Sequence, residues 1–177
     1  STEDLIDSLE QFLKKDLTVL SKSGTKGKAA TDNSEQYIDE IKNLLYEDTR
    51  IDEQVVKKIS HLGSKLIYAG KSNEALGFLL HLNKQIDNTK FKKLRIDIMI
   101  KIGLCYFFQN DNSNALKYYK QAIADASRIG VQVESAHPYV FLGTLYQFRC
   151  DLNKAESYLQ LALNHCENDP VSTKEHI

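Results

Sequence analysis

Hydrophobic residues recur three or four positions apart along most of the chain, which is the spacing of amphipathic helices. In residues 1–20, five leucines and Phe12 fall on one stripe, so the sequence predicts an N-terminal amphipathic helix. A second helix is predicted over about 35–47, with Ser34 as its N-cap. The segment 21–34 between them has no apolar periodicity and contains two glycines, which is typical of a flexible linker.

From residue 52 onward the sequence resembles itself at an offset of 40 residues. An apolar residue followed by glycine recurs, then an alanine, then an aromatic residue. The matched positions are Leu62-Gly63, Ile102-Gly103 and Leu142-Gly143; Ala75, Ala115 and Ala155; and Phe78, Tyr118 and Tyr158. The pattern predicts three repeats, at about 52–90, 91–130 and 131–170, followed by a tail at 171–177.

Each repeat is predicted to be a pair of helices. The first helices are expected at 53–69, 90–109 and 136–149, and the second at 72–87, 112–128 and 152–167. Helix starts are predicted at the caps Asp52 and Ser72 and beside Pro138, and helix ends at Gly70 and Gly130. The recurring glycines and alanines are expected to face the seam between paired helices, because small residues let two backbones approach closely. One such pair does not bury its apolar face alone, whereas a stack does, so an all-α solenoid is predicted.

Composition agrees with a helical fold. Two prolines and eight glycines in 177 residues are too few for a many-stranded β fold. The net charge of −1 and the four arginines give no general reason to bind nucleic acid. No apolar run is long enough for a membrane span, and the acidic N-terminus differs from a secretory signal. Three cysteines without a paired spacing suit a reducing compartment, so the cytoplasm is expected, with the nucleus as the alternative.

The repeat resembles the tetratricopeptide repeat. The resemblance lies in the apolar-glycine pair, in Tyr106 or Tyr146 one turn later, and in Ala115 or Ala155 at the start of the second helix. The family's usual repeat has about 34 residues, so this chain is similar to its long-repeat members. It departs from the family where Ile59, Met99 and Tyr139 take the place of the first-helix tryptophan.

The resemblance implies that the first helices line a concave surface that binds a partner. The residues that map to this surface are Lys57, Ser60, His61, Ser64 and Ile67; Asp97, Ile100, Lys101, Leu104 and Phe107; and His137, Val140, Phe141, Thr144 and Gln147. Ten of these are predicted to bind the partner, in a groove expected to be largely apolar. They are Ser64, Ile67, Ile100, Lys101, Leu104, Phe107, Val140, Phe141, Thr144 and Gln147.

The chaperone-binding members of the family hold a carboxylate with a clamp of Lys, Asn and Arg. Here Ser60, Ser64, His137 and Phe141 stand at clamp positions, so binding of that kind is not expected. The predicted function is that of a scaffold or adaptor, part of a larger assembly, that binds a helical or extended peptide of another protein. A peptide-responsive regulator similar to the bacterial pheromone receptors is the alternative, although residues 1–50 do not resemble a DNA-binding helix-turn-helix.

No enzymatic activity, cofactor or metal is expected. The sequence contains no phosphate-binding glycine loop and no nucleophile elbow. His165 and Cys166 are adjacent on a predicted helix, so their side chains point about 100° apart and do not form a catalytic dyad. The histidines and cysteines also lack the paired spacing of a zinc site.

Overall fold

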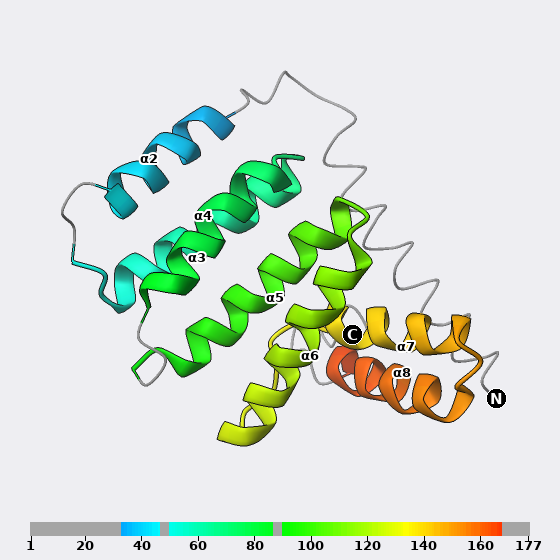
Figure 1. Cartoon of the computed structure of the whole chain (residues 1–177). Coiled ribbons are helices and arrows are strands. Elements are labelled where there is room, and N and C mark those ends of the chain that lie inside the picture. Colours follow the sequence, from blue (N-terminus) through cyan, green and yellow to red (C-terminus); the bar gives the residue numbers. More distant parts are fainter. Residues whose placement is uncertain (1–32, 47–49, 87–89, 168–177) are drawn as a thin grey trace, which may run out of the picture. The chain divides into compact units, whose positions relative to one another are not determined.

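The computed structural model describes residues 33–46, 50–86 and 90–167, and every regular element in these ranges is an α-helix (Figure 1). The helices are α2 (Ser34–Tyr46), α3 (Glu53–Tyr68), α4 (Ser72–Gln85), α5 (Lys92–Phe108), α6 (Asn112–Ile129), α7 (His137–Phe148) and α8 (Leu152–Glu167). The predicted all-α fold is therefore confirmed for the described residues. The predicted helix 1–20, nearly all of the predicted linker and the tail 171–177 lie outside them.

The described residues form two compact units, 33–134 with α2–α6 and 135–167 with α7 and α8. In the first unit, α3 pairs with α4 and α5 with α6, while α4 also packs on α5 and α2 packs on α3. In the second unit α7 pairs with α8. This pairing of neighbouring helices is that of the predicted solenoid. The single repeat domain at 35–170 stays a prediction.

The turn inside each helix pair is built the same way three times. Gly70, Asn110 and Cys150 have left-handed backbones, with φ of 78°, 59° and 57°. The N–H of the next residue donates to the carbonyl five positions earlier, for example Asp111 to Tyr106 at 2.9 Å. This is the αL ending of a helix, for which glycine and asparagine are best suited. The left-handed backbone conformation therefore recurs every 40 residues, as the sequence pattern does.

Each recurring glycine faces the side chain that lies sixteen residues later on the second helix. A Cβ atom on Gly103 would lie 2.5 Å from Tyr119 Cε1, and one on Gly143 would lie 2.6 Å from Leu159 Cδ2. The same atom on Gly63 would lie 3.2 Å from Leu79 Cδ2. The seam predicted from the small residues is confirmed, and the partly buried Tyr106 and Tyr118 stack beside it with ring centroids 5.7 Å apart.

The core of residues 33–134 is shared by four consecutive helices. Ile38, Ile41 and Leu45 of α2 join a buried cluster with residues of α3, α4 and α5. Helix α5 is apolar nearly all round, because Ile96, Ile98, Met99, Ile100 and Ile102 are all buried. Such a helix belongs to a protein interior rather than to a surface. None of the described helices is both long and apolar enough to cross a bilayer.

The predicted N-caps Ser34 and Ser72 were wrong, whereas the N-cap Asp52 and the helix end at Gly130 are confirmed. Asp52 caps α3 by accepting the Val55 N–H at 2.9 Å, and Gly130 ends α6 with φ of 72°. Ser72, however, is the first residue of α4, and the cap position is held by Lys71 without a side-chain hydrogen bond. Ser34 likewise lies inside α2, since Tyr37 N–H donates to the carbonyl of Asn33. In both cases the cap lies one residue earlier in the chain than predicted, a difference within the usual range for helix ends.

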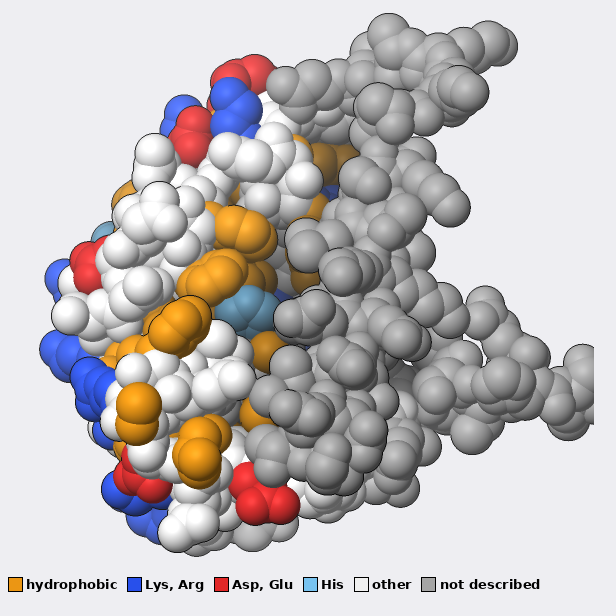
Figure 2. All heavy atoms as spheres, turned by 90° about the vertical axis from the view of Figure 1, so that its right-hand side faces the viewer, with side chains coloured by type: hydrophobic (Ala, Val, Ile, Leu, Met, Phe, Trp, Pro, Cys, Tyr) orange, Lys and Arg blue, Asp and Glu red, His pale blue; other side chains and the backbone are white. Residues whose placement is uncertain are grey.

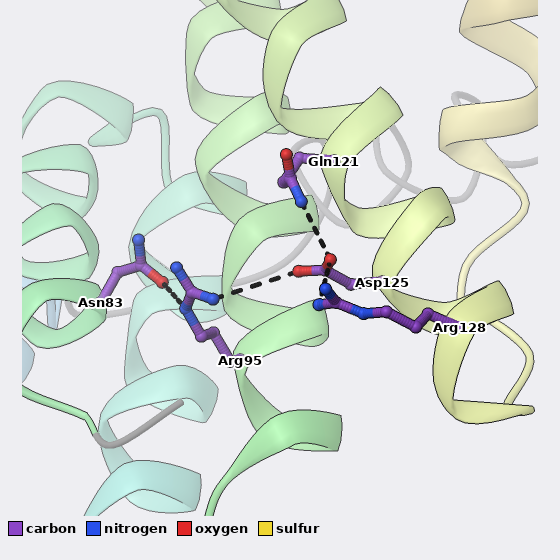
Figure 3. A network of polar contacts seen from close by, with 5 residues as sticks. All are labelled: Asn83, Arg95, Gln121, Asp125 and Arg128. Atoms are coloured by element: carbon purple, nitrogen blue, oxygen red, sulfur yellow. Dashed lines mark hydrogen bonds and ion pairs between the residues drawn. The ribbon is translucent and has the colours of Figure 1, made fainter. Parts of the chain in front are cut away.

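A polar network joins the ends of α4, α5 and α6 (Figure 3). Asp125 is 7% exposed, and its Oδ1 accepts hydrogen bonds from Gln121 Nε2 at 2.9 Å and Arg128 Nη2 at 2.8 Å. Arg95 Nη1 lies 4.0 Å from Asp125 Oδ2, and Arg95 Nε donates to Asn83 Oδ1 at 3.3 Å. The network ties three helices together at one end of the first unit.

Replacement of Asp125 by alanine is expected to lower the free energy of unfolding by about 1–2 kcal/mol, because it removes the acceptor that satisfies neighbouring donors. Urea denaturation of the wild type and of Asp125→Ala measures the change. Gln132→Ala, at an exposed position outside the network, is the control. Equal stability of Asp125→Ala and wild type would contradict a structural role for the network.

Candidate functional site

A hollow of about 420 Å³ lies between α3 and α5. Helix α3 contributes the side chains of Glu53, Lys57, Ser60, His61 and Ser64, helix α5 contributes Lys93, Leu94, Asp97 and Lys101, and Glu134 follows α6. The volume falls within the range of small-ligand pockets, about 300–1,000 Å³. Nine of the ten lining residues are polar, so the hollow offers hydrogen-bonding groups more than apolar surface.

A hydrogen-bonded triad forms part of the hollow. Ser60 Oγ donates to Asp97 Oδ2 at 2.6 Å, and Lys101 Nζ donates to both Ser60 Oγ at 2.6 Å and Asp97 Oδ2 at 2.5 Å. Ser60 is 3% exposed, so its hydroxyl is buried and requires these partners. The triad joins α3 to α5 and holds the polar side chains of the hollow in one arrangement.

The lysines of the hollow are each paired with an acid. Lys57 Nζ lies 2.6 Å from Glu53 Oε1, Lys93 Nζ lies 3.0 Å from Glu134 Oε1, and Lys101 pairs with Asp97. Opposite charges at these separations neutralise one another locally. The hollow therefore presents alternating charge without an excess of either sign.

Six of the residues that the resemblance mapped to the concave surface line this hollow. They are Lys57, Ser60, His61, Ser64, Asp97 and Lys101. Of the ten predicted partner-binding residues, only Ser64 and Lys101 belong to the hollow. Sequence reasoning missed Glu53, Lys93, Leu94 and Glu134, which lie at helix starts or between helices. The one sequence signal that could have identified any of these residues is the spacing of opposite charges four positions apart, as between Glu53 and Lys57.

Two apolar residues of the predicted partner-binding set are buried in the first unit. Ile67 is 4% exposed and Ile100 is 5% exposed, so neither offers its side chain to a partner. Leu104 is partly buried against the core cluster, and Phe107 is 38% exposed. The expected apolar groove includes residues of both units and stays a prediction, whereas the hollow described in the first unit is polar.

The remaining four predicted residues lie on α7, in the second unit. Thr144 and Gln147 are exposed, Phe141 is half-buried, and Val140 packs beside the buried pair Leu159 and Ala162. Their joining with Ser64 and Lys101 into one surface stays a prediction. Figure 2 shows hydrophobic side chains exposed on one face of the molecule. In the second unit, the large hydrophobic residues that are exposed are Phe148, Leu152 and Leu161.

Burial shifts the pKa values of two side chains of the kinds that act as nucleophile or base. Burial raises the pKa of Cys105 to about 12, so its thiol stays protonated and unreactive at neutral pH. Burial lowers the pKa of His137 to about 4, so this imidazole is neutral at pH 7. Among the described residues, no group of His, Cys, Asp and Glu is placed to hold a metal ion.

Comparison with known proteins places the repeats in a family. The tetratricopeptide repeat model matches residues 94–168, which include α5–α8 except for the first two residues of α5. No curated protein and no solved structure matches the chain. Tetratricopeptide repeats generally mediate protein–protein interactions and are typically non-catalytic. The matched region includes the glycine seams at Gly103 and Gly143 and the turns at Asn110 and Cys150, so residues 94–168 are similar to tetratricopeptide repeats.

Proposed function

We propose that this chain is a protein-interaction module that binds a peptide segment of another protein in the hollow between α3 and α5. The observation that carries the proposal is the hollow itself, an open concavity lined by hydrogen-bonding side chains on the first helices of two successive repeats. An extended or helical segment presents backbone or side-chain groups that such a surface recognises.

The fixed geometry of the hollow supports binding. Lys101 is held by Ser60 and Asp97, and Ser64 Oγ donates to the Ser60 carbonyl at 3.3 Å, so these side chains are ordered before a partner arrives. A preordered surface loses less conformational entropy on binding than a mobile one. The balanced charge favours a polar segment over a strongly acidic or basic one.

The proposal is tested with Ser64→Arg, which places a long cationic side chain in the hollow. Peptides selected by the wild-type chain from a random display library are titrated against wild type and variant by fluorescence anisotropy. We expect the variant to bind them at least about tenfold more weakly, equivalent to about 1.4 kcal/mol, because the arginine occupies the volume of the peptide.

A matched control is Ser157→Arg on α8. The Ser157 hydroxyl donates to the Asn153 carbonyl four residues earlier, as the Ser64 hydroxyl does to Ser60, but Ser157 is on a second helix and is not among the residues that line the hollow. This control is expected to keep wild-type affinity. Peptides that bind Ser64→Arg as tightly as the wild type would place binding elsewhere and refute the proposal.

A further inference from the structure

A second surface lies where α4 ends and α5 begins. Arg95, in the first turn of α5, bonds to Asn83 near the end of α4, and it also faces Asp125 near the end of α6 (Figure 3). These contacts bring Lys84 of α4 to the same end of the unit as Lys90 and Lys92. All three of these lysines are exposed. They are called the basic end below.

The acids near the basic end already have partners. Asp125 accepts a hydrogen bond from Gln121 and forms an ion pair with Arg128, and Glu134 pairs with Lys93. At the start of α3, Asp52 is the N-cap of the helix, and Glu53 pairs with Lys57. Among the described residues no acid pairs with the basic end, where Lys90 Nζ lies only over the Phe91 ring, at 5.3 Å from its centroid. Asp87, in the loop 87–89, lies outside the described residues.

The charge of the surrounding sequence has the same sign. Residues 50–134 contain fourteen Lys and Arg but eight Asp and Glu, although the whole chain is nearly neutral at −1. Lys92 and Lys93 also stand in the first turn of α5, where cations are unfavourable beside the positive end of the helix dipole. Helix stability therefore does not explain Lys92, whereas Lys93 is paired with Glu134.

We propose that the basic end binds an acidic peptide segment of a partner protein. The complementary charge is negative, and three exposed, flexible ammonium groups suit carboxylates spaced along a peptide. A single-stranded nucleic acid is disfavoured as the ligand, because its binding uses aromatic rings for base stacking and Phe91 is 7% exposed. The surface is distinct from the hollow and does not depend on the function proposed for it.

The test uses the full chain and a fluorescent peptide of alternating glutamate and serine. Anisotropy titrations compare the wild type with Lys84→Glu/Lys92→Glu. We expect the double variant to bind at least about tenfold more weakly, because two attractive contacts become repulsive. Wild-type binding should also weaken as salt is raised from about 0.05 M to about 0.2 M, since exposed charges are screened.

The matched control is Lys117→Glu/Lys120→Glu, which changes the net charge equally on α6. It is expected to keep at least half of the wild-type affinity, and Ser64→Glu, which adds a negative charge to the hollow, is expected to keep it as well. Equal loss in both lysine variants would mean that only net charge matters and would overturn the proposal. So would loss in Ser64→Glu, which would place the acidic peptide in the hollow, or tighter binding of a single-stranded oligonucleotide of equal charge.

Discussion

Replacement of Gly103 by leucine should lower the free energy of unfolding by about 3 kcal/mol. Even a Cβ atom at this position would lie 2.5 Å from a ring carbon of Tyr119, and Tyr119 is fully buried. The ring is rigid and has no space to move into, so α5 and α6 must separate to admit the new side chain. Urea denaturation followed by circular dichroism measures the loss.

Gly77→Ala is the control for this substitution. Gly77 lies in the interior of α4, and a Cβ atom there would meet nothing within 4 Å. Alanine at this site is expected to raise stability by about 0.5–1 kcal/mol, because glycine is a poor helix former. If Gly103→Leu were as stable as the wild type, the close packing of the seam would be disproved.

Replacement of Ile41 by alanine should lower the free energy of unfolding by about 2–5 kcal/mol, the cost of a large-to-small change in a packed core. Ile41 is fully buried, and it belongs to the cluster that α2 shares with α3, α4 and α5. The large effect is expected because α2 is an integral part of the unit, although the family model matches only residues 94–168.

Asn43→Ala on the same helix is the control, since Asn43 is exposed and its loss leaves no cavity. Thermal and urea denaturation of both variants separate the contribution of packing from that of helix formation in α2. A change below about 0.5 kcal/mol in Ile41→Ala, the scale of a surface substitution, would show that α2 is not packed as described.

The helices and their seams were predictable because both depend on local spacing. A small residue every 40 positions identified the close approach of the paired helices, and Gly70 and Gly130 marked helix ends. The 40-residue offset places Asn110 and Cys150 in register with Gly70, but the residue types differ, so the sequence did not reveal that all three adopt the left-handed conformation.

The candidate site was harder to predict because it depends on which face of α5 is covered. The apolar residues of α5 lie on nearly every side of this helix. Helical periodicity therefore does not distinguish Ile100, which is buried, from a residue that faces a partner. The triad of Ser60, Asp97 and Lys101 joins residues about one repeat apart on different helices. No local pattern reports such a contact, although the face that the resemblance assigned does contain all three residues.

The recurring turn has a kinetic consequence. Residues 69–71, 109–111 and 149–151 connect the paired helices, and the seam contact of Gly103 with Tyr119 spans only sixteen positions. Closing a chain segment of about ten residues takes about 10–100 ns, and proteins rich in such local contacts fold in microseconds to milliseconds. A helix pair that opens locally can therefore close again quickly, without waiting for distant parts of the chain to meet.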